Sequence, residues 1–127
     1  MLLMSGCAPK VSKTYAEDAA KKATASMLGE IGKVPVEKRI EVVKTVKKDG
    51  GWCVDITYFY RYPDSTKQGS ITYLFDLKEP IELENLEMLE ILSKSKTRWT
   101  ETGQEFPIPN NGKIVIIVHP GQIITAC

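Results

Sequence analysis

Residues 52–62 read WCVDITYFYRY, and large apolar side chains occupy every second position. The even-numbered residues are Trp52, Val54, Ile56, Tyr58, Tyr60 and Tyr62, and the odd-numbered residues are Cys53, Asp55, Thr57, Phe59 and Arg61. A period of two in β-branched and aromatic residues is typical of a strand that buries one face. A strand of this length belongs inside a sheet, so we predict a neighbouring strand on each side.

The sequence on either side of this strand predicts both neighbours. Residues 39–48 form the first, and Asp49-Gly50-Gly51 then provides a tight turn because glycine accepts positive φ. Residues 70–77 form the second, after a polar loop at 63–69. The apolar positions of these two strands are Ile40, Val42, Val43 and Val46, and Ile71, Tyr73, Phe75 and Leu77.

Residues 14–31 have helical spacing instead. Their apolar positions recur every three or four residues and are Ala16, Ala19, Ala20, Ala23, Met27, Leu28 and Ile31. Thr14 and Glu17 have the spacing of a capping box, and Gly32 followed by Pro35 is a natural end. We predict one amphipathic helix whose alanine face can lie close against a sheet.

The C-terminal part of the chain adds two or three strands. Residues 82–99 are ambiguous, and we predict a short helix followed by a strand near 94–100. Two prolines exclude a central strand at 106–109, and residues 110–112 form a turn. The apolar run 114–118 predicts a strand that is covered on both faces. Residues 119–122 then suit a type II turn, after which residues 123–126 would pair back.

These elements predict a single α+β domain over residues 14–127. We expect an N-terminal helix packed on a curved antiparallel sheet of five or six strands, which is similar to the cystatin-like and NTF2-like folds. The chain has 127 residues, of which 43% are hydrophobic, so it can bury a core within one domain. Its longest clear apolar run, 114–118, is far too short to span a membrane.

Residues 1–10 read MLLMSGCAPK and resemble the end of a bacterial lipoprotein signal peptide. In that family an apolar stretch leads into two small residues and a cysteine, which Ser5-Gly6-Cys7 matches. The resemblance implies that residues 1–6 belong to the signal peptide, that Cys7 is lipidated and that residues 7–13 are a tether. Alanine rather than aspartate at position 8 implies the outer membrane, facing the periplasm. The alternative is that Cys7 has no processing role.

The chain has three cysteines, and acylation of Cys7 would leave Cys53 and Cys127. An exported protein meets an oxidising compartment, so these two are candidates for a disulfide. Two free thiols are the alternative. The sequence leaves both possibilities open, because it does not give the Cα separation that a disulfide requires.

Candidate catalytic residues are few. His119 is the only histidine and lies in a predicted turn, where we expect a purely structural role. Asp55 is expected to be a surface aspartate paired with a lysine across the strands. The alternative is that Asp55 acts as a general base with Tyr58 or His119, as a pocket aspartate does in NTF2-like enzymes. No cysteine or histidine cluster has zinc spacing and no phosphate loop occurs, so we expect neither a metal nor a cofactor.

Two groups of residues are candidates for a surface that binds a partner. Tyr60 and Tyr62 lie at the loop end of their strand, where we expect them to protrude, and aromatic residues are enriched at binding hot spots. Lys94, Lys96 and Arg98 alternate, so a strand would place three cations in one row. Such a row would meet anionic lipid headgroups or an acidic partner, or else protect a sheet edge as a solvated row.

The sequence therefore predicts a cell-envelope lipoprotein, held to the membrane by its lipid, that serves a protein partner as a non-catalytic binding or assembly module. The alternative is a small NTF2-like enzyme that uses Asp55 with Tyr58 or His119. A net charge of +1, from 17 basic and 16 acidic residues, gives no field that would attract nucleic acid. The sequence does not identify the partner.

Overall fold

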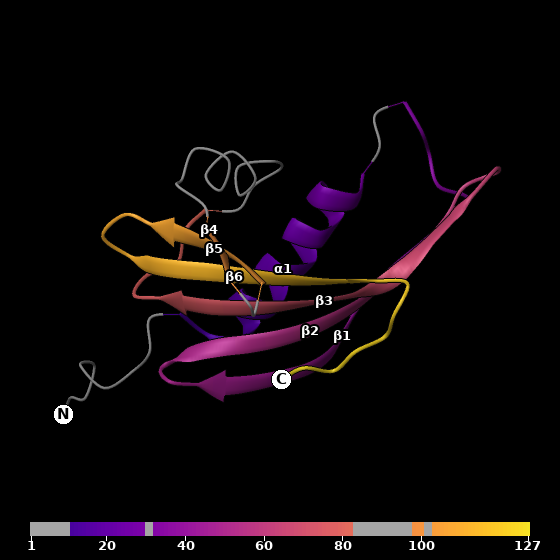
Figure 1. Cartoon of the computed structure of the whole chain (residues 1–127). Helices are drawn as coiled ribbons and strands as arrows, with labels where there is room; N and C mark the ends of the chain where they lie inside the picture. Colours follow the sequence, from indigo (N-terminus) through magenta and orange to yellow (C-terminus); the bar gives the residue numbers. More distant parts are fainter. Residues whose placement is uncertain (1–10, 30–31, 83–97, 101–102) are drawn as a thin grey trace.

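The computed structural model describes residues 11–29, 32–82, 98–100 and 103–127, and this part of the chain is an α+β fold (Figure 1). Its elements are α1 (Lys13–Leu28), β1 (Glu37–Lys48), β2 (Gly51–Arg61), β3 (Thr66–Leu77), β4 (Arg98–Thr100), β5 (Gly103–Ile108) and β6 (Gly112–Pro120). The strands form one antiparallel sheet in the order β1-β2-β3-β6-β5-β4. The predicted fold class is confirmed, whereas the likeness to cystatin-like or NTF2-like folds stays a prediction.

Strand β2 lies between β1 and β3, as its alternating sequence predicts. Val54 and Ile56 have no exposed surface and belong to the same apolar cluster as the alanines of α1. They lie opposite Tyr73 and Ile71 of β3, which are also fully buried. The even-numbered face of β2 is therefore the centre of the core.

Helix α1 packs on this face through small side chains. The predicted alanine stripe is confirmed, because each of its members is at most 1% exposed: Ala16, Ala19, Ala20 and Ala23. Thr24, also buried, exchanges a 2.8 Å hydrogen bond with the hydroxyl of Tyr73 and so ties the helix to β3. Short side chains let the helix backbone approach the sheet closely, and the aromatic residues of β2 and β3 supply the apolar volume.

The ends of α1 differ from the prediction. Ser12 is the N-cap, and its hydroxyl accepts a hydrogen bond from the amide of Tyr15 at 3.0 Å. The predicted capping box is wrong, because Glu17 instead accepts the hydroxyl proton of Thr45 on β1 at 2.6 Å. At the other end α1 stops at Leu28, short of residue 31, with Gly29 as the C-cap.

Strand β1 contains one more residue than β2 along their shared ladder. Val42 lies opposite Ile56 and Lys44 lies opposite Asp55, so Val43 has no partner between them. Such a β-bulge changes which residues share a face. Thr45, and not Lys44, consequently lies on the side of β1 that faces α1. Its hydroxyl can therefore reach the carboxylate of Glu17.

Strand β5 runs through Pro107, although the sequence excluded a central strand there. Pro107 lies opposite Lys113 of β6, whereas β4 pairs only with residues 103–105 of β5. Among the described residues, the proline therefore has a neighbouring strand on one side alone, which is where a strand tolerates it. The predicted turn follows, with positive φ at Asn110 and Gly112.

Three other predictions have different outcomes. Strand β3 begins at Thr66, so the polar loop is shorter than the predicted 63–69. Most of the ambiguous stretch 82–99 lies outside the described residues, but β4 agrees with the strand predicted near 94–100. Strand β6 is buried on both faces only at Ile114, Val115 and Ile116, because Val118 is 46% exposed.

No helix in the described part of the chain combines the length and apolar character needed to cross a bilayer.

The chain turns at residues 119–122, as predicted. The amide of Gln122 donates to the carbonyl of His119 at 3.2 Å, and Gly121 has a φ of 71°. The expectation that residues 123–126 pair back as a strand is wrong. They form no strand and instead contact β2 and β3 on the face of the sheet opposite α1.

Candidate binding face

The face of the sheet opposite α1, which we call the far face, is polar at its centre. Buried Asp55, Ser70 and Thr72 lie on it, because their positions in β2 and β3 have the parity opposite to the core residues. Residues 122–127, which we call the strap, follow β6 and run back across the lower strands of the sheet (Figure 1). The strap is exposed along almost its whole length.

Ser70 of β3 holds the first half of the strap. Its hydroxyl donates to the carbonyl of Gln122 at 2.8 Å and accepts from the amide of Ile124 at 2.9 Å. One side chain thus satisfies a donor and an acceptor of a segment that has no strand neighbour.

Asp55 of β2 holds the second half. Its carboxylate accepts the amide of Ala126 at 3.2 Å and that of Cys127 at 2.9 Å, and it accepts the hydroxyl of Thr72 at 2.6 Å. The expectation of a surface aspartate paired with a lysine is wrong, because Asp55 has no exposed surface. Three donors replace the water that a carboxylate loses on burial.

A disulfide joins Cys53 of β2 to Cys127 at the end of the strap, with a Cα separation of 5.7 Å. The candidate pairing is present, and it closes a loop across 74 positions of the chain. On the chain-entropy model a loop of this size stabilises the fold by roughly 4 kcal/mol.

The hydrogen bonds of the strap can be compared with the conformational cost of ordering it. Fixing six residues costs about 6–12 kcal/mol of conformational free energy. The two hydrogen bonds to Ser70 and the two to the carboxylate of Asp55 return about 4–9 kcal/mol. The free energy returned by these hydrogen bonds is therefore close to the conformational cost, and the disulfide adds a covalent restraint at Cys127.

His119 joins this polar cluster from β6. Its Nε2 lies 3.2 Å from the hydroxyl of Thr72, which in turn donates to Asp55. The structure thus links His119 to Asp55 through Thr72, whereas Tyr58 lies on the opposite side of β2, among the core residues. Within the described residues, no three histidine, cysteine or acidic side chains gather closely enough to hold a metal ion.

A groove of about 270 Å³ lies beside the strap on the far face. Its lining includes Arg39 and Glu41 of β1, Thr57 and Phe59 of β2, and Ile123 of the strap. The guanidinium carbon of Arg39 lies 4.6 Å from the centre of the Phe59 ring, which is a cation–π contact. The groove therefore combines an aromatic surface, an exposed isoleucine and charges of both signs, and we call it the strap groove.

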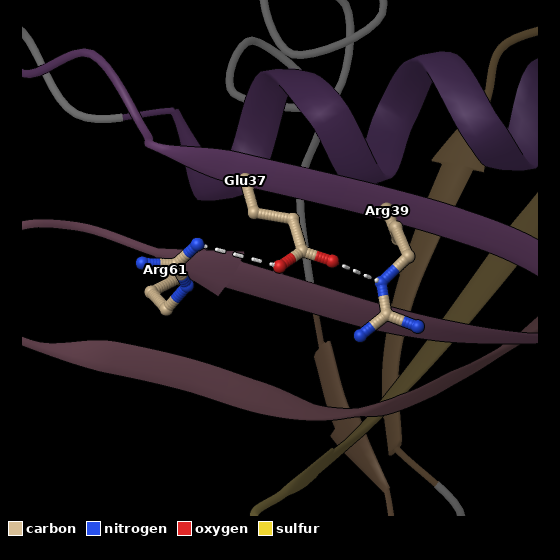
Figure 2. Close-up of polar contacts among 3 residues, drawn as sticks. All are labelled: Glu37, Arg39 and Arg61. Atoms are coloured by element: carbon tan, nitrogen blue, oxygen red, sulfur yellow. Dashed lines mark ion pairs between the residues drawn. The ribbon is translucent and has the colours of Figure 1, made fainter.

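Glu37 orients the arginine of this groove. Its carboxylate contacts Nε of Arg39 at 2.9 Å and Nη2 of Arg61 at 3.6 Å. Figure 2 shows the two terminal nitrogens of Arg39 directed away from Glu37, which leaves these donors for another group. The three side chains are 40–55% exposed, so the pairs add at most about 1 kcal/mol to stability and act chiefly by positioning.

The prediction that Tyr60 and Tyr62 protrude is wrong. They are 3% and 4% exposed and belong to the core cluster, against which Met27 and Leu28 of α1 pack. Nζ of Lys33 lies 5.8 Å from the centre of the Tyr62 ring and adds to its cover. Burial raises the pKa of Tyr60, and the neighbouring Tyr62 raises it further. The predicted strand end does contribute to the groove, but through Phe59 and its neighbour Tyr58.

The predicted cation row is described only in part. Lys94 and Lys96 lie outside the described residues, as does Cys7. Arg98 begins β4, where it lies opposite Glu105 of β5 in the ladder. Sequence reasoning missed Ser70, Thr72 and Ile123, for which hydrophobic patterning gives no signal.

Comparisons of the chain with protein-family models, with curated proteins and with solved structures found no match. Function is therefore inferred from the residues and the geometry of the far face.

Proposed function

We propose that this protein is a cell-envelope lipoprotein, anchored through Cys7, which acts without catalysis as a binding module for a protein partner. The strap groove is the proposed binding surface. Three features support the proposal: the resemblance of residues 5–7 to a lipoprotein processing site, a disulfide of the kind that persists in oxidising compartments, and an exposed groove with an aromatic wall.

The proposal rests chiefly on the positions of the proposed anchor and of the groove, which lie toward opposite ends of β2. Trp52, at the start of β2, donates its indole N–H to the carbonyl of Val11 at 2.9 Å, which fixes the point where the N-terminal segment meets the domain. Phe59 of the strap groove lies further along the same strand, about 23 Å away at the rise of a β-strand. A lipid on Cys7 would hold one end of β2 near the membrane and leave the groove toward the other end.

Acylation of Cys7 is the first prediction. We expect the protein, expressed in a Gram-negative host from its full genomic frame, to begin at Cys7 and to carry the mass of the attached acyl chains. Intact-protein mass spectrometry of the membrane fraction measures this directly. Cys7→Ser is the control and should abolish the added mass. A mature protein that retains an unmodified Cys7 would remove the anchor from the proposal.

Loss of partner binding in Phe59→Ala is the second prediction. The substitution removes the aromatic wall of the strap groove and the surface on which Arg39 stacks. Because truncating an aromatic hot spot costs about 2 kcal/mol or more, we expect the partner recovered by crosslinking from intact envelopes to fall about tenfold or more. Quantitative mass spectrometry of the purified, crosslinked protein provides the measurement.

Val118→Ala is the matched control, since Val118 is 46% exposed and lies outside the groove. It should recover the same partner as the parent protein. Thermal unfolding of each variant separates binding from folding, which Tyr60→Ala and Tyr62→Ala cannot do because both remove core side chains. Equal recovery with Phe59→Ala and with the parent would exclude the groove as the binding surface.

The alternative function, a small enzyme, is favoured by one observation. Asp55 and His119 are linked through Thr72 on the same face of the sheet. However, Asp55 has no exposed surface, and the strap amides occupy its oxygens, so a substrate has no access to it. This arrangement favours a role in holding the strap, and we therefore propose binding rather than catalysis.

A further inference from the structure

The strap is held by four hydrogen bonds and a disulfide, and most of its surface is exposed. Its side chains Ile123 and Ile124 are 64% and 36% exposed, so only Ile124 gains appreciably from the hydrophobic effect. Its backbone is instead held by Ser70 and Asp55, and its end is held by the disulfide. One covalent bond therefore controls a segment that polar contacts alone hold only weakly.

We propose that the Cys53–Cys127 disulfide is a redox-sensitive latch, and that its reduction releases the strap from the far face. Release removes Ile123 from the strap groove and opens the buried carboxylate of Asp55 to water. The latch would thus switch the groove between a formed and a dismantled state. This last consequence rests on the proposed binding function, but the release itself does not.

The chemistry is an ordinary exchange with a dithiol. Cys53 is 1% exposed whereas Cys127 is a partly exposed residue, so the proposed target of the reductant's thiolate is Sγ of Cys127. The attack forms a mixed disulfide and expels the thiolate of Cys53, which takes up a proton. The second thiol of the reductant then closes its own disulfide and frees the thiol of Cys127. Two electrons and two protons pass from the dithiol to the protein.

Reduction should leave the rest of the sheet intact. The hydrogen-bonded ladder between β2 and β3 covers residues on both sides of Cys53, and the core lies on the opposite face. Cys127 belongs to the strap, and it contacts the sheet through the disulfide to Cys53 and through its amide, which donates to Asp55. The released state is therefore a folded domain with a free C-terminal segment, and not an unfolded chain.

Amide hydrogen exchange tests the latch. Both samples carry Cys7→Ser, which prevents thiol exchange with the N-terminal cysteine, and one also carries Cys127→Ser. We expect the amides of Ile124 and Ala126 to lose their protection in Cys127→Ser and to exchange at least about tenfold faster. The amides of Ile56 and Tyr73 exchange faster only as far as the lower global stability requires, and they stay protected relative to an unfolded chain. Treating the Cys7→Ser protein with dithiothreitol provides the same comparison without a substitution in the strap.

Two results would overturn the latch. Unchanged protection of the strap amides would mean that the hydrogen bonds hold the strap without the disulfide. Loss of protection at the core amides as well as at the strap amides would mean that the domain unfolds as a whole without the disulfide, and not that the strap alone is released. The exchange measurement needs no partner and no lipid, so a failure of partner capture or of acylation would not change its outcome.

Discussion

We expect Asp55→Ala to lower the free energy of unfolding by about 3–5 kcal/mol, a large share of the stability of a small domain. The substitution removes an acceptor for three donors at once: the hydroxyl of Thr72 and the amides of Ala126 and Cys127. Thr72 is 1% exposed, so water cannot easily replace the carboxylate there. Urea unfolding at pH 7, followed by circular dichroism, measures the loss.

Asp76→Ala is the matched control for this substitution. Asp76 lies on the adjacent strand β3, but its side chain is exposed, so its removal should change stability by less than about 0.5 kcal/mol. Asp55→Asn should be intermediate, because the amide keeps one acceptor oxygen but loses the charge and adds a donor. A loss below about 1 kcal/mol in Asp55→Ala would contradict the role assigned to this carboxylate.

Stability should also fall steeply above pH 10, and Tyr73 should account for part of the slope. Burial raises the pKa of Tyr73 well above its ordinary value, and the hydrogen bond with Thr24 offsets only part of that rise. Below pH 10 the residue is protonated in both states, and its contribution is complete. Above pH 10 the unfolded chain ionises while the folded chain does not, so stability falls by up to about 1.4 kcal/mol per pH unit.

Tyr73→Phe tests this assignment. The variant should be less stable at pH 8, because it loses the hydrogen bond with Thr24, but its stability should fall less steeply between pH 10 and 11.5. Urea unfolding at a series of pH values gives both quantities, with Cys7→Ser in each protein to prevent thiol exchange at alkaline pH. The same slope with and without the tyrosine hydroxyl would show that other groups cause the alkaline loss.

The sequence predicts the core well because the core follows local rules. Alternation in 52–62 identified the buried face of β2, and alanines at helical spacing identified the packing face of α1. The prediction that Tyr60 and Tyr62 protrude is wrong because it depends on their place at the end of the strand and not on their parity. They share the parity of Val54, so they lie on the same side of the strand and are buried with it.

The strap could not be predicted because its contacts connect distant parts of the chain. Residues 123–126 read IITA, which has strand propensity. Their amides nevertheless donate to side chains of the sheet, that of Ile124 to Ser70 and that of Ala126 to Asp55. These partners lie more than 50 positions away in sequence, and a serine or an aspartate in a strand gives no sign of which backbone it will hold. The disulfide was the one contact of the strap that a count of cysteines could suggest.

The bulge at Val43 has a consequence for how copies of this protein behave at high concentration. β1 ends the strand order, so its outer side is where the sheet of another molecule would add. The unpaired Val43 interrupts the regular spacing of backbone donors and acceptors there, and Lys44 and Lys47 bring charge to the same stretch. Crowded molecules therefore lack a continuous template along β1 through which one sheet could fuse with the next.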